Sequence, residues 1–201
     1  MKTSARGEKP EPGARVKFLR FLYLAGPRKG QVLATRVEQY NPATGTMSWT
    51  DEDTKAGVPH VVTYTGEARD ILDWFVAHRD ACCPALFQED GKPLAKDQLD
   101  GTWSRGCRTA GVPSGRKNDG YTIHNLRHAF VSEAYDAGLS EGVIMAHTNH
   151  VQAPTMLRYL RTSAAAQQRA QEQLEAYRRA QATKMRERAK KVRRLRVTTA
   201  R

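Results

Sequence analysis

Two short strand-like stretches joined by a polar turn, with an amphipathic helix directly after them, constrain the fold of this chain most. Residues 46–50 and 60–65 are the strand candidates, and the polar segment 51–57 suits a hairpin connection between them. Thr65 is then a candidate N-cap for a helix over residues 66–79. The apolar stripe of this helix consists of Ala68, Ile71, Leu72, Phe75 and Val76.

The rest of the chain has mostly helical patterns interrupted by glycine and proline. The patterns predict helices over residues 16–24, 29–37, 96–110, 124–137 and 140–146, and another from Pro154 that carries Tyr159. A glycine, or a Gly-Pro pair, follows the first, third and fourth of these segments. We therefore expect an α+β fold that is mostly α-helical, with a small antiparallel β-sheet.

Composition along the chain predicts one domain with two flanking segments. A length of 201 residues suffices for one sizeable core. Residues 1–13 are expected to form a disordered tail, and residues 14–162 the domain. Residues 163–201 are expected to form a basic helical extension, because segment 163–196 has no Gly or Pro and is rich in Ala, Gln, Glu, Lys and Arg.

The charge balance indicates a polyanionic partner, with a solvated basic protein as the plainer interpretation. Lys and Arg total 33 against 21 Asp and Glu, a formal net charge of +12. The sequence has no apolar run long enough for a transmembrane helix and no secretion signal at its start. Cys82, Cys83 and Cys107 suit neither a disulfide framework nor a zinc site, so we expect a reducing, cytoplasmic setting.

Six scattered polar residues have the chemistry of a phosphodiester-cleaving site. They are Arg28, Lys55, His124, Arg127, His150 and Tyr159. A tyrosine hydroxyl, with a pKa of about 10, is a weak nucleophile unaided, and nearby cations favour its phenolate form. Two guanidiniums can hold the phosphoryl oxygens as negative charge develops on them. The set predicts covalent DNA cleavage without a metal or nucleotide cofactor.

In these residues, and over positions 16–161, the chain resembles the catalytic domain of the tyrosine recombinases, the phage integrase family. A lone His-x-x-Arg motif would be weak, but the six positions follow the family's order and context. The match consists of Arg28 in segment 26–30, Lys55 in the turn 54–57, His124-x-x-Arg127, and His150 nine residues before Tyr159.

The resemblance implies a role for each of these side chains. Tyr159 would attack the phosphorus and form a 3′-phosphotyrosine, while both arginines hold the phosphate. Lys55 would protonate the leaving 5′ oxygen. His124 would accept or relay the tyrosine proton, and His150 would donate a hydrogen bond to a phosphoryl oxygen. Attack by a second 5′-hydroxyl would reseal the strand, so the implied function is site-specific recombination of double-stranded DNA.

The chain departs from the family pattern at two positions and in its length. Gln31 stands where the family usually has an acid, three residues after the first arginine. Asn149 replaces the usual glycine before the second histidine, and asparagine tolerates a left-handed backbone better than most residues. Few residues precede the match, whereas family members usually carry an N-terminal DNA-binding domain. We expect either an excised domain or a short variant.

Other interpretations of these residues remain open. His124 and His128 have the i, i+4 spacing of a zinc pair, but Asn125 is not the glutamate of a metalloprotease helix. Taken alone, each of the six residues, like His147, would more often be structural than catalytic. At the level of the protein, the alternatives are a non-catalytic DNA-binding module that keeps the integrase fold and a basic interaction protein.

The basic end of the chain has three interpretations: a solvated helix, a clamp on the DNA backbone, or an oligomer contact. Residues 178–201 contain eleven Lys or Arg and a single acid, Glu187. This density favours phosphate contact, and we expect an oligomer on DNA. The candidate DNA contacts are Arg178, Arg179, Lys184, Arg186, Lys190, Lys191, Arg193 and Arg194.

Overall fold

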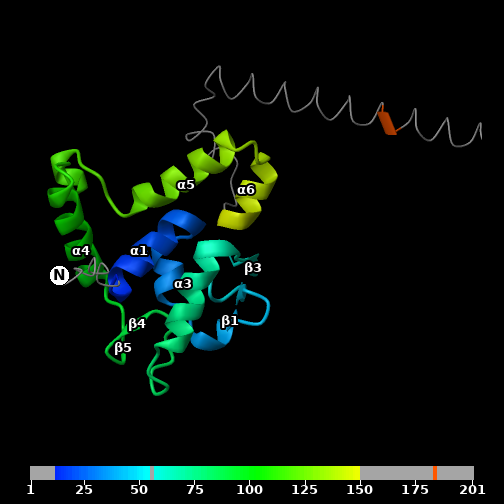
Figure 1. Cartoon of the computed structure of the whole chain (residues 1–201), viewed down its shortest axis with the longest axis horizontal. Coiled ribbons are helices and arrows are strands. Elements are labelled where there is room, and N and C mark those ends of the chain that lie inside the picture. The colour runs from blue at the N-terminus through cyan, green and yellow to red at the C-terminus, as the bar shows by residue number, and fades with distance from the viewer. Residues whose placement is uncertain (1–11, 55–56, 150–182, 185–201) are drawn as a thin grey trace, which may run out of the picture.

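The structure, a computed structural model, describes residues 12–54, 57–149 and 183–184 (Figure 1). The α-helices are α1 (Ala14–Ala25), α2 (Lys29–Leu33), α3 (Gly66–Ala77), α4 (Lys96–Thr109), α5 (His124–Asp136) and α6 (Glu141–Thr148). The strands are β1 (Tyr40–Asn41), β2 (Thr46–Trp49), β3 (His60–Thr63), β4 (Gln88–Glu89) and β5 (Lys92–Pro93). Two short 3₁₀ helices are η1 (Val37–Gln39) and η2 (Arg116–Asn118). The predicted fold class, mostly helical α+β, is confirmed.

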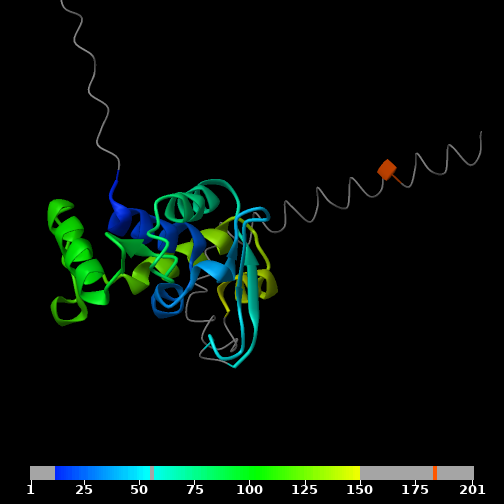
Figure 2. The ribbon, with the colours of Figure 1, turned by 90° about the horizontal axis from the view of Figure 1, so that it is seen from below.

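Helix α1 lies at the centre of the described part. It contacts α3, α4 and α5, and both views place α4 and the three-stranded sheet on opposite sides of it (Figures 1 and 2). Its Phe18 and Phe21 have no exposed surface, and the ring of Phe87 meets that of Phe18 edge-on at 5.0 Å. Burial of such a side chain contributes about 1.5–3 kcal/mol, so α1 organises the core.

The predicted hairpin is present as β2 and β3 within an antiparallel sheet ordered β1-β2-β3. Thr46 pairs with Thr63 and Trp49 with His60, so the two strands are in register over their full length. Side chains alternate, with Val62 buried and Val61 62% exposed. One face of the sheet therefore packs on the core, which fixes the register of the hairpin.

Several element boundaries differ from the expectation. The helix expected over residues 29–37 ends at Leu33, because Thr35 turns inward as a buried residue. Its hydroxyl accepts a bond from the Trp49 indole at 3.0 Å, and its carbonyl accepts one from Leu86 at 2.9 Å. Thr65 occupies the N-cap position of α3, but its side chain makes no capping bond.

Helices α5 and α6 form a corner with a small core of their own, made by Val131, Ala134 and Ile144. The hydroxyl of Ser140 caps α6 by accepting a bond from Val143 at 3.4 Å, and α6 ends at Thr148. Among the described residues, no helix is both long and apolar enough to cross a membrane. The predicted helix from Pro154 lies outside the described residues, as does the extension 163–201 apart from the helical pair 183–184.

Candidate active site

The C-terminal end of α6 gathers side chains from three distant segments. Main-chain carbonyls in the last turn of a helix have no partner within the helix, so they need donors from elsewhere. Here Ala146 O accepts from His60 of β3 at 2.8 Å, and Thr148 O from Arg127 of α5 at 2.8 Å. Asn149 O accepts from Arg28, the residue before α2, at 2.7 Å. We call these three carbonyls and their donors the α6 hub.

Arg127 is the most deeply buried of the three donors of the hub, with 3% of its surface exposed. One terminal nitrogen donates to Thr148 O, and the other donates to Gly26 O at 2.8 Å. Gly26 ends α1 with φ +64°, and a Cβ at this position would lie 2.2 Å from Cδ1 of Phe130. Glycine is therefore required for the close approach of α1 to α5, which brings the Gly26 carbonyl to the guanidinium.

Arg28 reaches the hub from the segment between α1 and α2, directly after Gly26 and Pro27. It precedes α2 in an extended conformation, and its bond to Asn149 spans 121 positions of sequence. Asn149 has φ 53° and ψ 47°, so the left-handed turn after α6 survives with asparagine in place of glycine. Gln31 leaves its amide nitrogen buried without a hydrogen-bond partner among the described residues.

His124 is the first residue of α5, one turn before Arg127. Its ring lies 4.7 Å from that of His128, nearly perpendicular to it. Although the side chain is partly exposed, burial by the surrounding protein lowers its pKa, and His128 and Arg127 lower it further. His124 is therefore neutral near pH 7 and can accept a proton.

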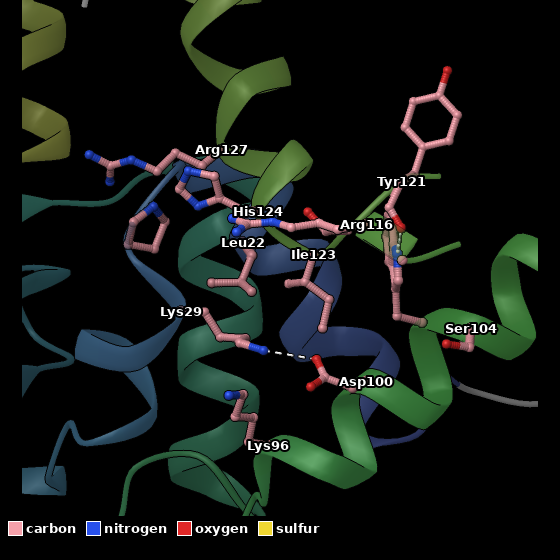
Figure 3. Close-up of a pocket in the computed structure, with 14 residues that line it drawn as sticks. Leu22, Lys29, Lys96, Asp100, Ser104, Arg116, Tyr121, Ile123, His124 and Arg127 are labelled. Atoms are coloured by element: carbon pink, nitrogen blue, oxygen red, sulfur yellow. Dashed lines mark hydrogen bonds and ion pairs between the residues drawn. The ribbon is translucent and has the colours of Figure 1, made fainter. Parts of the chain in front are cut away.

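A cavity of about 480 Å³ opens beside His124 and Arg127 (Figure 3). Its walls come from α4, from the start of α2 and from the segment that leads into α5. Lys29 is paired there with Asp100 at 2.9 Å, and Lys96 and Arg116 also line it. The charged side chains that line the cavity are therefore mostly cationic, which suits an anionic ligand.

The structure describes three of the six predicted catalytic residues. Arg28 and Arg127 meet at the hub, and His124 stands one helical turn from Arg127. Lys55, His150 and Tyr159 lie outside the described residues. Of the predicted DNA contacts in the extension, Lys184 is described, as an exposed helical residue. The other seven contacts lie outside the described part.

Two histidines of the site were not predicted as functional. His60 belongs to the hub, and His147 donates from Nε2 to Ala25 O at 3.0 Å while stacking on Phe130. Burial lowers the pKa of both. A polar residue on the buried face of the predicted strand was the available signal for His60, whereas His147 agrees with the structural interpretation.

Comparison with known proteins places this geometry in a family. The model of the phage integrase family matches residues 1–166. No curated protein sequence matches the chain. Among the solved structures that share the fold are the following three, and the chain spans less than two thirds of each. The Tn1549 transposon integrase in complex with circular intermediate DNA is 14% identical with a TM-score of 0.60, and the match covers 79% of this chain and 57% of that one. The XerA recombinase is 15% identical with a TM-score of 0.57, and the match covers 80% of this chain and 62% of that one. A lambda integrase dimer bound to a COC′ core site is 15% identical with a TM-score of 0.59, and the match covers 74% of this chain and 42% of that one.

At these identities the solved structures show the fold, and the family match covers most of the chain. The neighbours are tyrosine recombinases and integrases, the family associated with site-specific recombination. The mostly helical domain with its three-stranded antiparallel sheet agrees with that membership. The chain therefore belongs to the phage integrase family and has the fold of the tyrosine recombinase catalytic domain.

Proposed function

We propose that this chain cleaves and rejoins DNA strands through a covalent bond between Tyr159 and the 3′ phosphate. The convergence of Arg28 and Arg127 at the α6 hub, with the neutral His124 one turn away, is the observation that carries the proposal. The two arginines lie 99 positions apart in the sequence, so the fold itself brings them together. Two fixed guanidiniums suit the two non-bridging oxygens of one phosphodiester.

In the proposed cleavage, the Tyr159 oxygen bonds to phosphorus as the bond from phosphorus to the 5′ oxygen breaks. The tyrosine proton passes to His124, and Lys55 gives a proton to the departing 5′ oxygen. Arg28 and Arg127 stabilise the charge on the five-coordinate phosphorus, and a well-placed donor of this kind contributes about 3–4 kcal/mol. Attack by a 5′-hydroxyl on the phosphotyrosine runs the same steps in reverse and rejoins a strand.

Exchange between two duplexes requires more than one copy of the chain on the DNA. We propose an oligomer assembled on double-stranded DNA, working in the cytoplasm. Two of the solved neighbours are a complex with circular intermediate DNA and a dimer bound to a core site, which supports this assembly. Light scattering with and without bound duplex tests it. A single copy on every cleaved duplex would contradict it.

The competing function is a non-catalytic DNA-binding module that keeps the integrase fold. Such a module would need basic residues but no proton acceptor beside its phosphate-binding arginines. The placement of His124, a side chain that can accept a proton, one helical turn from Arg127 favours the enzyme. Binding to DNA without any covalent product is the result expected of the module.

A trapping experiment separates the two functions. Duplexes with a randomised core and a nick just beyond the candidate cleavage positions lose the short 5′-hydroxyl fragment after cleavage, so the covalent product accumulates. We expect a band of protein joined to DNA on a denaturing gel for the wild type, and none for Tyr159→Phe. Tyr177→Phe, the other tyrosine after His150, is the matched control and should keep the band. No band from the wild type with any duplex would refute the proposed function.

A further inference from the structure

We propose that His60 is a positioning residue, which ties the hairpin that carries Lys55 to the same helix end that holds both arginines. The inference rests on the proposed function, since it concerns the proton donor of that reaction. Through His60, the end of α6 would fix the positions of both phosphate-binding arginines and of the base of the hairpin. His60 itself touches neither the substrate nor the reacting atoms.

The contacts of His60 join two parts of the fold. It opens β3, opposite Trp49 of β2, and its ring stacks on the indole with centroids 5.2 Å apart and planes at 11°. Its Nε2 lies 2.8 Å from Ala146 O, and because a carbonyl only accepts, Nε2 carries the hydrogen. The side chain is 9% exposed, so solvent replaces this bond poorly.

On the α6 side, the bond falls within the hub. Ala146 O lies two residues before Thr148 O and three before Asn149 O, which accept from Arg127 and Arg28. A shift of the last turn of α6 would therefore move the anchors of both arginines and of the hairpin together. Coupling of this kind needs packed, hydrogen-bonded contacts between the parts, and these contacts are present.

On the hairpin side, the described residues around Lys55 form a closed turn. The buried Thr54 donates from its hydroxyl to Val58 O at 2.8 Å and accepts from Val58 N at 3.0 Å. Gly57 N also donates to Thr54 O at 3.1 Å. Lys55 is adjacent in sequence to Thr54, and His60 lies only two residues beyond Val58. The described turn residues on both sides of Lys55 are therefore hydrogen-bonded to one another, and only a few positions of sequence separate them from His60.

The electrostatic surroundings agree with this assignment. Burial lowers the pKa of His60, and the charges of Arg127 and Arg28 lower it further. The neutral ring donates from Nε2 and leaves Nδ1 buried, without a hydrogen-bond partner among the described residues. A neutral imidazole brings a donor to Ala146 without adding a third charge beside the two arginines.

The test uses the chemistry of the leaving group. When sulfur replaces the bridging 5′ oxygen of the scissile phosphate, the leaving group is a thiolate of pKa about 8.5, which needs no proton. A variant that only misplaces Lys55 should therefore cleave the sulfur substrate at the wild-type rate. A variant that is defective in folding or phosphate binding should cleave both substrates slowly. Single-turnover cleavage of both substrates is measured in the full chain.

For His60→Leu, we expect cleavage of the oxygen substrate to slow by about 100-fold, and that of the sulfur substrate by less than about threefold. Lys55→Ala should give the same pattern, and the double variant should be no slower than Lys55→Ala alone. His60→Gln, whose amide nitrogen can take the place of Nε2, should restore most of the rate. If His60→Leu fails to fold, His60→Asn, whose amide is too short to reach Ala146 O, replaces it.

His147→Leu is the matched control. His147 lies in the last turn of α6 and also donates to a main-chain carbonyl, but that carbonyl belongs to Ala25 of α1 and not to the hairpin. It should affect both substrates to the same extent. Equal slowing of both substrates by His60→Leu, or further slowing in the double variant, would overturn the inference and leave the proposed function intact. If the wild type forms no covalent product with either substrate, the proposed function fails and the inference with it.

Discussion

At the scale of single residues, Arg127 and Arg28 differ in burial, which predicts unequal costs of substitution. Arg127 is buried and spans Gly26 O and Thr148 O, whereas Arg28 is partly exposed and reaches Asn149 O. Lysine keeps the charge but cannot reproduce a planar fork. We expect Arg127→Lys to lower the free energy of unfolding by about 1–3 kcal/mol and Arg28→Lys by less, measured by urea denaturation. Equal losses would contradict this account.

Asn149 carries a second prediction at this scale, because its backbone is left-handed at φ 53°. Alanine in that conformation costs about 1–2 kcal/mol, and glycine avoids the penalty. We therefore expect Asn149→Ala to be less stable than the wild type, and Asn149→Gly to be at least as stable as Asn149→Ala by the same urea measurement. If alanine is tolerated as well as asparagine, the left-handed turn does not fix the position of the Asn149 carbonyl.

Residue types and spacing indicated which side chains to consider, but not how they are held. The sequence contains His124-x-x-Arg127, and helical geometry alone puts these two residues one turn apart. Nothing in the sequence predicts that Arg127 bonds to Gly26 O or that Arg28 bonds to Asn149 O, because these contacts depend on how α1, α5 and α6 pack. The catalytic roles of all six residues stay predictions.

At the scale of elements, long periodic segments were predictable and short ones were not. The stripe that includes Ile71, Leu72 and Phe75 predicted α3, which spans Gly66–Ala77. Strands β1, β4 and β5 have two residues each, too few for alternation to be recognised. The end of α2 at Leu33 was missed because it depends on Thr35, which accepts hydrogen bonds from Trp49 of β2 and from the main chain of Leu86.

The packing of elements around buried histidines predicts acid sensitivity. His60 links β3 to α6 and His147 links α6 to α1, and burial lowers the pKa of both below the usual 6.5. The unfolded chain then binds protons more readily than the folded one. The contribution of these two histidines to stability is therefore fully present above pH 6.5, and it is lost as the pH falls through their lowered pKa values in the folded state.

Urea denaturation across this pH range measures the effect. His147→Gln keeps a donor for Ala25 O but removes one titrating group. We expect its unfolding free energy to fall less steeply on acidification, by up to about 1.4 kcal/mol per pH unit. A slope identical to that of the wild type would show that His147 does not contribute to acid sensitivity.

At the scale of the whole molecule, the fold class followed from the sequence because the helical patterns and the strand hairpin have recognisable periodicity. The dense apolar residues of α1 could be recognised without knowing their partners, and they contact α3, α4 and α5. The cavity beside His124, whose charged lining is mostly cationic, could not be predicted, because its walls come from segments far apart in the chain (Figure 3). Net charge, by contrast, is a property of composition, and it predicts how the whole chain responds to salt.

The basic extension provides the prediction at this scale. If its Lys and Arg neutralise DNA phosphates, binding releases counterions, and each contact contributes about −0.9 to the slope of log affinity against log salt. Deleting residues 178–201 removes eleven positive charges, so we expect weaker binding and a flatter slope by fluorescence anisotropy. The matched control changes the five candidate arginines of this segment (Arg178, Arg179, Arg186, Arg193 and Arg194) to lysine. Because the lysine variant keeps the positive charge, its slope should equal that of the wild type. If the deletion leaves the slope unchanged, the salt dependence arises from the domain formed by α1 to α6 and not from the extension.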